Sequence, residues 1–254
     1  MKRTFYPVGQ GAFYSEIFHL GGGAYFSMVY DCGSGASLCN PDNALISQIK
    51  NLKFPHGTID VLFLSHFHAD HINGVKELSK NNKIKKIVIP LVEDAELFVC
   101  EKCNEKYDNS KLRQFCEALK DPKKLLFDNE NKETQIIRVL PIRQEGMYSS
   151  SSENNIMLDD EEFEIDSISS DIEIKSGSIL SVKKVWRYIP FNYSERSIRD
   201  ELLKRSLIGA DGKPDFNKMS EIVEVYKEFF GLKNAGKEFN VNSLRVASVP
   251  LSDS

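Results

Sequence analysis

The stretch LFLSHFHADHING, residues 62–74, holds three of the five histidines in the chain, with Asp70 between the second and the third. Imidazole nitrogens and carboxylate oxygens are side-chain donors that zinc and similar ions prefer. Side chains two residues apart on an extended segment point the same way, so His66 and His68 can face one ion. Asp70 and His71 follow where the chain turns, and they can face a neighbouring ion. We therefore predict a metal site here and regard a chance cluster of histidines on a polar loop as the weaker explanation.

The segments around this cluster alternate between strand and helix patterns. The expected elements, in chain order, are a hairpin across Gly21–Gly23, a helix over 44–52, a strand over 59–64, a helix over 73–78 and a strand over 84–89. The cluster thus follows the carboxyl end of a strand and precedes a helix, which is where α/β folds tend to place their sites. This order of elements predicts a layered α/β protein.

The second half of the chain has a less regular pattern. The expected elements are a helical region over 93–126, an acidic solvated loop over about 145–162, a strand over 172–189, a helix opened by a capping box of Ser197 and Asp200, a helix over 219–230 and a strand over 239–251. Residues 144–174 carry ten acidic side chains and no basic one, and such runs usually form a solvated face.

The composition limits the class of protein. The formal net charge is −4, so the chain as a whole has no positive field that would attract nucleic acid or anionic lipid. The N-terminal residues do not resemble a signal peptide, and no stretch of about 18 apolar residues occurs, so we predict no membrane span and a cytoplasmic protein. Five cysteines are an odd number, which favours a reduced compartment over a disulfide framework.

The residues of the cluster resemble a known signature. H-F-H-A-D-H at 66–71, with the apolar strand and Ser65 before it and Gly74 after it, is similar to the H-x-H-x-D-H motif of the metallo-β-lactamase-fold hydrolase superfamily. The Val8–Gly11 stretch and the strand that ends in Asp31-Cys32-Gly33 agree with that resemblance. The last strand, with Asn242-Ser243-Leu244, resembles the segment that precedes the next metal ligand in the DNA-uptake competence branch.

This resemblance implies an α/β fold of the metallo-β-lactamase type, a four-layer αβ/βα sandwich whose N-terminal portion carries a helical and acidic insertion. We expect a single domain over 1–254. Within it, 1–92 would be the half that carries the metal motif, 93–238 the insertion and helices, and 239–254 the start of the C-terminal half.

The resemblance also implies a hydrolase with one or two zinc ions, with manganese or iron(II) as alternatives. A metal-bound water or hydroxide would attack a phosphodiester, thioester, lactone or amide, and we favour a phosphodiester or nucleic-acid-type substrate. By position, His66 and His68 would hold the first metal, and Asp70 and His71 the second. Asp70 would also orient the attacking water, and Asp31 would lie behind the ligands and orient the metal loop.

The ligand set is incomplete by this count. Catalytic zinc normally has three protein ligands and an open position, yet no histidine follows His71 in the chain. Divided over two ions, the cluster supplies only two protein ligands to each. Three explanations stay open: a truncated version of a longer hydrolase, a site completed by a partner chain or by a second copy, and a catalytically incomplete protein that acts as an interaction partner.

Other residues give weaker signals. Cys100 and Cys103 form a C-x-x-C pattern, but Cys116 is the one further cysteine nearby, so ordinary helix cysteines are the better interpretation. His19 and His56 are weak candidates for an approach to the metals. We also expect three lysines beside the site, where they would suit an anionic substrate, although a solvated edge is the commoner explanation for them: Lys83, Lys85 and Lys86.

Overall fold

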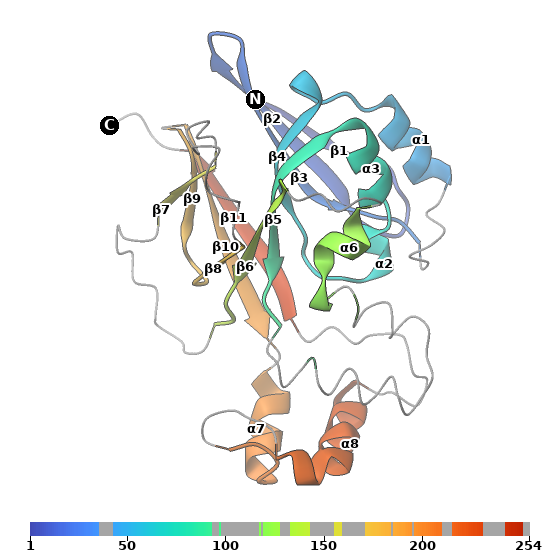
Figure 1. Ribbon diagram of the computed structural model, residues 1–254, viewed down its shortest axis with the longest axis vertical. Coiled ribbons are helices and arrows are strands. Elements are labelled where there is room, and N and C mark those ends of the chain that lie inside the picture. Colours follow the sequence, from blue (N-terminus) through green and yellow to red (C-terminus); the bar gives the residue numbers. More distant parts are fainter. Residues whose placement is uncertain are drawn as a thin grey trace.

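The protein folds around two β-sheets, seen in a computed structural model (Figure 1). It describes residues 1–35, 43–92, 97, 117, 119–127, 133–142, 155–158, 171–183, 185–194, 196–209, 215–230 and 242–250. The first sheet has seven strands: β1 (Lys2–Phe5), β2 (Phe13–Gly21), β3 (Ala24–Cys32), β4 (Thr58–Phe63), β5 (Lys83–Pro90), β6 (Gln135–Val139) and β8 (Ile172–Ile174), paired in that order. The second sheet has four strands in the order β11 (Asn242–Pro250), β10 (Trp186–Ser194), β9 (Ile179–Val182) and β7 (Asn155–Met157).

The first sheet changes from antiparallel to parallel pairing at β3. The β1, β2 and β3 strands form an antiparallel meander, and β2 and β3 are joined through Gly21–Gly23, all of which have positive φ angles. From β3 to β8 every neighbouring pair is parallel. Their carboxyl ends therefore meet along one edge of the sheet, and the histidine cluster follows β4 at that edge.

Helices cover one face of the first sheet, and the second sheet covers the other (Figure 1). The helices near that sheet are α1 (Asn43–Asn51), α2 (Ala69–Ile72), α3 (Val75–Asn81) and α6 (Pro122–Leu126). Leu62 of β4 joins the core on the helical side, while its neighbours Val61 and Phe63 join the core between the sheets. Adjacent residues of a strand point to opposite faces, so β4 is buried on both sides, as its apolar sequence predicts.

The face of the second sheet that points away from the first sheet is exposed to solvent. Tyr193 and Val249 on this sheet are each more than 40% exposed. The two remaining helices, α7 (Arg196–Lys204) and α8 (Met219–Phe230), pair with each other and lie below both sheets in Figure 1. Within the described part of the chain, three layers of the expected αβ/βα sandwich are therefore present, and no helix forms the fourth.

Several elements predicted from sequence are confirmed within one or two residues: the Gly21–Gly23 hairpin, α1, β4, β5 and α8. The strand expected over 239–251 is confirmed as β11, whose described part begins three residues later, at Asn242. The helix expected over 73–78 begins at Val75, after the short α2 helix that the sequence did not predict. Most of the helical region expected over 93–126 lies outside the described residues, as do Cys100, Cys103 and Cys116.

Three predictions about the second half were wrong. The strand expected over 172–189 is three strands, because the chain turns at Gly177, where φ is +85°, and again at Lys183. The first turn takes the chain from one sheet to the other. The acidic loop expected over 145–162 contains β7, which pairs with β9, and the rest of that loop lies outside the described residues. The α7 helix begins at Arg196, so Ser197 lies inside it and is not its N-cap.

No helix among the described residues is long and apolar enough to span a membrane. Two η turns, Pro55–Gly57 and Phe216–Lys218, complete the described elements.

Candidate functional site

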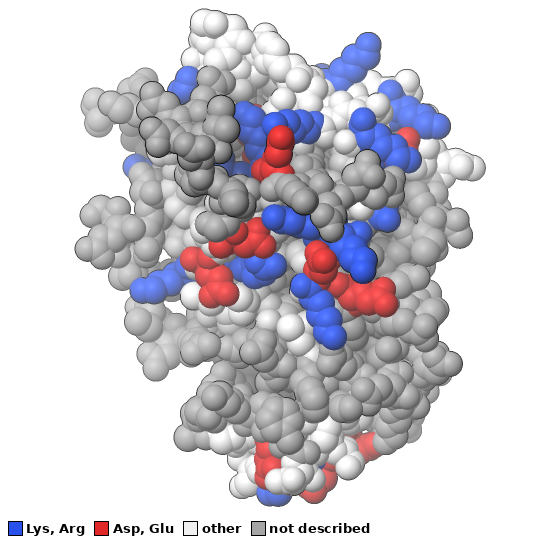
Figure 2. Space-filling view, in the orientation of Figure 1, with Lys and Arg blue, Asp and Glu red and all other residues white. Residues whose placement is uncertain are grey.

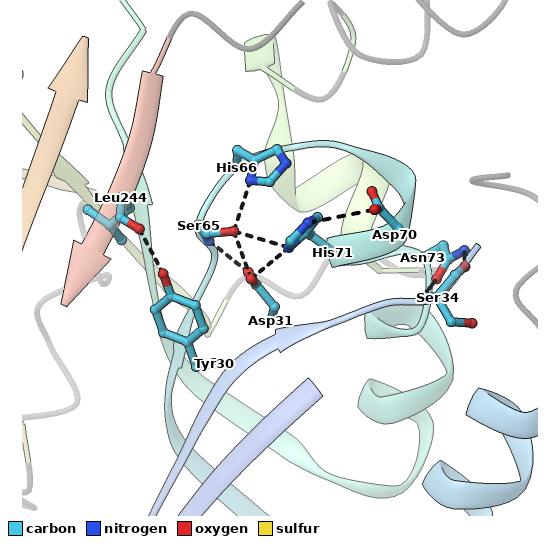
Figure 3. Close-up of polar contacts among 9 residues, drawn as sticks. All are labelled: Tyr30, Asp31, Ser34, Ser65, His66, Asp70, His71, Asn73 and Leu244. Carbon is cyan, nitrogen blue, oxygen red and sulfur yellow. Dashed lines mark hydrogen bonds and ion pairs between the residues drawn. The ribbon is translucent and has the colours of Figure 1, made fainter. Parts of the chain in front are cut away.

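The histidine cluster runs from the loop after β4 into the short α2 helix, beside the end of β3 (Figure 3). Two segments hold this loop through their backbones. Ala12 donates to the carbonyl of Asp70 at 3.1 Å, and Gly33 donates to the carbonyl of Ala12 at 3.0 Å. Gly74 donates to the carbonyl of Cys32 at 2.8 Å. The strand end and the loop before β2 thus fix the backbone that carries Asp70.

Glycine is required where these segments touch. A Cβ atom on Gly33 would lie 2.4 Å from the carbonyl carbon of Asp70 and 2.5 Å from the amide nitrogen of His71. One on Gly11, where φ is +139°, would lie 2.6 Å from the carbonyl oxygen of Asp70. The V-G-Q-G and D-C-G stretches noted in the sequence therefore serve close backbone packing against the metal motif.

Asp31 is the buried centre of the site. Its carboxylate accepts the amide of Ser65 at 2.7 Å on Oδ1, and on Oδ2 the hydroxyl of Ser65 at 2.7 Å and Nδ1 of His71 at 2.8 Å. Burial raises the pKa of Asp31, and the hydrogen bonds from His71 and Ser65 counter that rise. Its backbone has φ +53°, a left-handed conformation that is uncommon for a residue other than glycine and that tends to persist at functional sites.

The imidazole rings of the cluster lie close together. The ring centroid of His66 is 4.0 Å from that of His71 and 4.6 Å from that of His68. Burial and the neighbouring His71 and His68 lower the pKa of His66 to about 3, so this ring is neutral at neutral pH. Burial lowers the pKa of His71, but its hydrogen bond to Asp31 and the charges of Asp31 and Asp70 outweigh burial and raise it.

Asp70 and His71 present their outer atoms to each other. Oδ2 of Asp70 lies 3.8 Å from Nε2 of His71, and both side chains are about a quarter exposed or less. Two donors bound to one tetrahedral zinc ion lie roughly 3.4 Å apart. This pair is therefore close to the spacing of two ligands of a single ion.

The second sheet reaches the site through its last strand. The amide of Leu244 in β11 donates to the carbonyl of Ser65 at 2.8 Å. The hydroxyl of Tyr30 in β3 donates to the carbonyl of Leu244, also at 2.8 Å (Figure 3). The backbone of Leu244 thus ties β11 both to the loop that carries the histidines and to β3.

The structure brings all the predicted site residues into one neighbourhood: Asp31, His66, His68, Asp70 and His71. His66 lies at least as close to His71 as to His68, so the division into two separate ligand pairs is not evident from the ring positions. Sequence reasoning missed the roles of Ser65, Tyr30 and Leu244. Ser65 was noticeable as the residue before the first histidine, whereas the contacts of Tyr30 and Leu244 join residues 214 apart and leave no local pattern.

The three lysines expected beside the site are elsewhere. Lys83 pairs with Thr58 at the start of β4, whereas the cluster follows the end of that strand. Lys83 contacts Glu133, Lys85 contacts Asp60 at 2.9 Å, and Lys86 donates to a backbone carbonyl. These lysines therefore do not form a substrate-binding surface at the histidine cluster.

The two weak histidine candidates also lie away from the cluster. His19 and His56 flank the ring of Tyr25, with His19 in β2 and His56 in the turn before β4. Among the described residues on the face drawn in Figure 2, basic side chains lie among acidic ones.

Residues 26–133 match the family model described as the metallo-beta-lactamase superfamily. The chain is similar to that superfamily over this segment. Its α/β sheets with flanking helices agree with the metallo-β-lactamase-type fold. A solved structure of human tRNase Z, short form, is similar to the chain at 14% identity and a TM-score of 0.38, over 76% of this chain and 60% of that one. The chain thus spans 60% of the length of that structure, and no curated protein matches it.

Members of the metallo-beta-lactamase superfamily commonly bind divalent metals such as zinc, and the donor types of this cluster fit such an ion. His66 is a neutral imidazole, and His71 turns Nδ1 to a buried carboxylate, as metal-ligating histidines usually do. The arrangement supplies pairs of potential ligands that lie close together, such as Asp70 and His71. In the part of the chain that the structure describes, no group of three or more His, Cys, Asp or Glu side chains is placed to hold an ion.

Proposed function

We propose that this protein is a metal-dependent hydrolase whose one or two metal ions are held by His66, His68, Asp70 and His71. The observation that carries this proposal is the hydrogen-bonded group in which buried Asp31 holds His71 through Nδ1 and leaves Nε2 on the side of Asp70. A histidine oriented in this way from behind is the usual arrangement of a metal ligand. The match to the metallo-beta-lactamase superfamily supports the same chemistry.

The side chains of the cluster would have different roles in metal binding and hydrolysis. When bound, a zinc ion supplies a Lewis acid that polarises the substrate and makes water a nucleophile at neutral pH. His66 and His68 would hold metal from the loop after β4, and Asp70 and His71 would hold it from α2. Asp70, whose carboxylate is about a quarter exposed, also accepts a hydrogen bond from the attacking water and orients it.

A phosphodiester or nucleic-acid-type molecule is the substrate class we propose. The support is the final strand, whose Asn242-Ser243-Leu244 stretch resembles the corresponding segment of the DNA-uptake competence branch. The hydrogen bonds of Leu244 to Ser65 and Tyr30 are consistent with a strand that belongs to the site.

The first test is the metal content of the full chain, by elemental analysis of protein purified without added metal, together with hydrolysis of bis(p-nitrophenyl) phosphate. We expect one to two equivalents of zinc, and both zinc and hydrolysis should fall in His66→Ala and Asp70→Asn. Matched controls are His19→Ala and Asp200→Asn, because both residues are exposed and lie outside the cluster. Less than about a tenth of an equivalent of zinc, with no hydrolysis, would refute the proposal.

A second function, that of a catalytically incomplete interaction protein, is favoured by one observation: the described residues offer pairs of ligands and no set of three. It predicts weakly held, substoichiometric metal and no hydrolysis of phosphodiesters or esters. A chain that gains zinc and activity only when a partner or a second copy is added would instead support a shared site. Titration of activity against chain concentration separates these outcomes.

A further inference from the structure

The hydroxyl of Ser65 lies at the meeting point of the polar groups behind the cluster (Figure 3). Ser65 is buried, with 6% of its surface exposed. Its Oγ atom is 2.7 Å from Oδ2 of Asp31, 2.9 Å from Nδ1 of His66 and 3.2 Å from Nδ1 of His71. A single hydroxyl group thus contacts three side chains, and two of them are proposed metal ligands.

The hydrogens in this group can be assigned by counting. A hydroxyl has one hydrogen to donate and two lone pairs, and an ionised carboxylate can only accept. The contact of Ser65 with Asp31 is the shortest of the three, so its hydrogen belongs there. Oγ of Ser65 can then only accept from His66, which requires that the ring hydrogen of His66 lies on Nδ1.

The same count applies to the second histidine. Nδ1 of His71 is 2.8 Å from Oδ2 of Asp31, so it donates to the carboxylate. A neutral imidazole carries one ring hydrogen. With that hydrogen on Nδ1 in both rings, Nε2 of His66 and Nε2 of His71 each keep a bare lone pair, and the Nε2 atom of His71 is the one that faces Asp70.

We propose that Ser65 is a positioning residue that fixes His66 in the Nδ1–H tautomer. Because the Ser65 hydroxyl donates its hydrogen to Asp31, its oxygen can only accept from Nδ1 of His66. Asp31 fixes His71 directly and His66 through the Ser65 hydroxyl. One buried carboxylate therefore sets the tautomers of two histidines. The consequence for metal binding rests on the proposed function above, whereas the tautomer itself does not require a metal.

The test is ring-nitrogen NMR on metal-free full-length protein with ¹⁵N-labelled histidine, recorded at about pH 8, above the ordinary pKa of histidine. In the natural chain, we expect His66 to carry its hydrogen on Nδ1. In Ser65→Ala, the acceptor is lost, and His66 should change to the Nε2–H tautomer. Ser65→Thr, which restores a hydroxyl, should return it to Nδ1–H. The exposed His19 serves as an internal control, because its spectrum should be the same in all three proteins.

Zinc affinity provides the second measurement. Removal of a hydrogen-bonding partner behind a metal ligand typically costs 10–100-fold in metal affinity, so Ser65→Ala should bind zinc about 10–100-fold more weakly, and Ser65→Thr should recover. Urea unfolding of each variant shows whether the fold itself has changed.

The tautomer of His66, in the natural chain and in Ser65→Ala, decides whether Ser65 has the proposed role. An Nε2–H signal for His66 in the natural chain would overturn it, whether or not Ser65→Ala folds, and so would an unchanged Nδ1–H signal in a folded Ser65→Ala. If the natural chain binds no zinc but shows His66 as Nδ1–H, the proposed function fails and this inference stands. If zinc binds and His66 is Nε2–H, the inference fails and the proposed function stands.

Discussion

Replacement of Gly33 by alanine tests the close packing between the end of β3 and the metal motif. An added Cβ atom would lie 2.4 Å from the carbonyl carbon of Asp70, whereas ordinary contact begins near 3.4 Å, so the backbone must move by about 1 Å. The neighbouring atoms belong to the backbone of Asp70 and His71 and cannot rotate away. Overpacking of this kind costs about 1–3 kcal/mol of unfolding free energy. A displacement of about 1 Å at a catalytic group can also lower the rate by about 100-fold.

The assay compares Gly33→Ala with Gly22→Ala by urea unfolding, zinc titration and phosphodiester hydrolysis. Gly22 lies in the β2–β3 turn at φ +59°, and an added Cβ there meets nothing within 4 Å. Gly22→Ala therefore introduces backbone strain without a clash at the site, at a cost of about 1 kcal/mol. We expect both variants to be destabilised and only Gly33→Ala to lose zinc and activity. Zinc affinity and hydrolysis in Gly33→Ala equal to those of the natural chain would refute the reasoning.

Three further outcomes follow from the structure. Tyr30→Phe leaves the carbonyl of Leu244 without the hydroxyl and should lower the unfolding free energy by about 1 kcal/mol in urea; no change would mean that this bond does not tie β11 to the site. Burial raises the pKa of Asp171, but hydrogen bonds from Lys123 and Arg138 outweigh burial and lower the pKa. The stability that ionised Asp171 contributes is therefore complete above its unfolded pKa of about 3.9 and is lost as the pH falls through the folded pKa. The difference in stability between the natural chain and Asp171→Asn, at most about 1 kcal/mol because Asp171 is a third exposed, should therefore shrink below about pH 4, and a difference that grows in acid would contradict this sign. Zinc at about 100 times its dissociation constant should add about 2.7 kcal/mol to the unfolding free energy, and a chelator should remove that gain, whereas an unchanged melting temperature would argue against a specific site.

The first half of the fold could be predicted because its signals are local. The apolar run of β4 ends at Ser65, the glycines of the β2–β3 turn mark a hairpin, and helical spacing marks α1. The second half was harder because its segments change sheet. The 172–189 segment has the composition of one long strand. A turn with a positive φ angle at Gly177 takes it from one sheet to the other, and a second such turn at Lys183 separates β9 from β10 within the second sheet. Only the packing of the sheets determines where those turns fall.

The site shows the same difference between local and long-range information. The spacing of His66, His68, Asp70 and His71 is visible in six residues, and so is the chemistry of their donors. The position of Asp31 behind them depends on parallel pairing of β3 with β4, which a sequence pattern does not specify in register. The lysines of β5 were misplaced for a related reason, since the parallel pairing of β4 with β5 places Lys83 beside Thr58, at the opposite end of β4 from the cluster.

Ser65 links the relative position of the two sheets to the orientation of the histidines. Its amide and hydroxyl donate to Asp31 at the end of β3, and its carbonyl accepts from Leu244 of β11 in the other sheet. All of its polar groups are therefore engaged, and they connect three strands. Because the same hydroxyl contacts His66, any shift of β11 that moves the carbonyl of Ser65 also moves the acceptor that sets the tautomer of this ring.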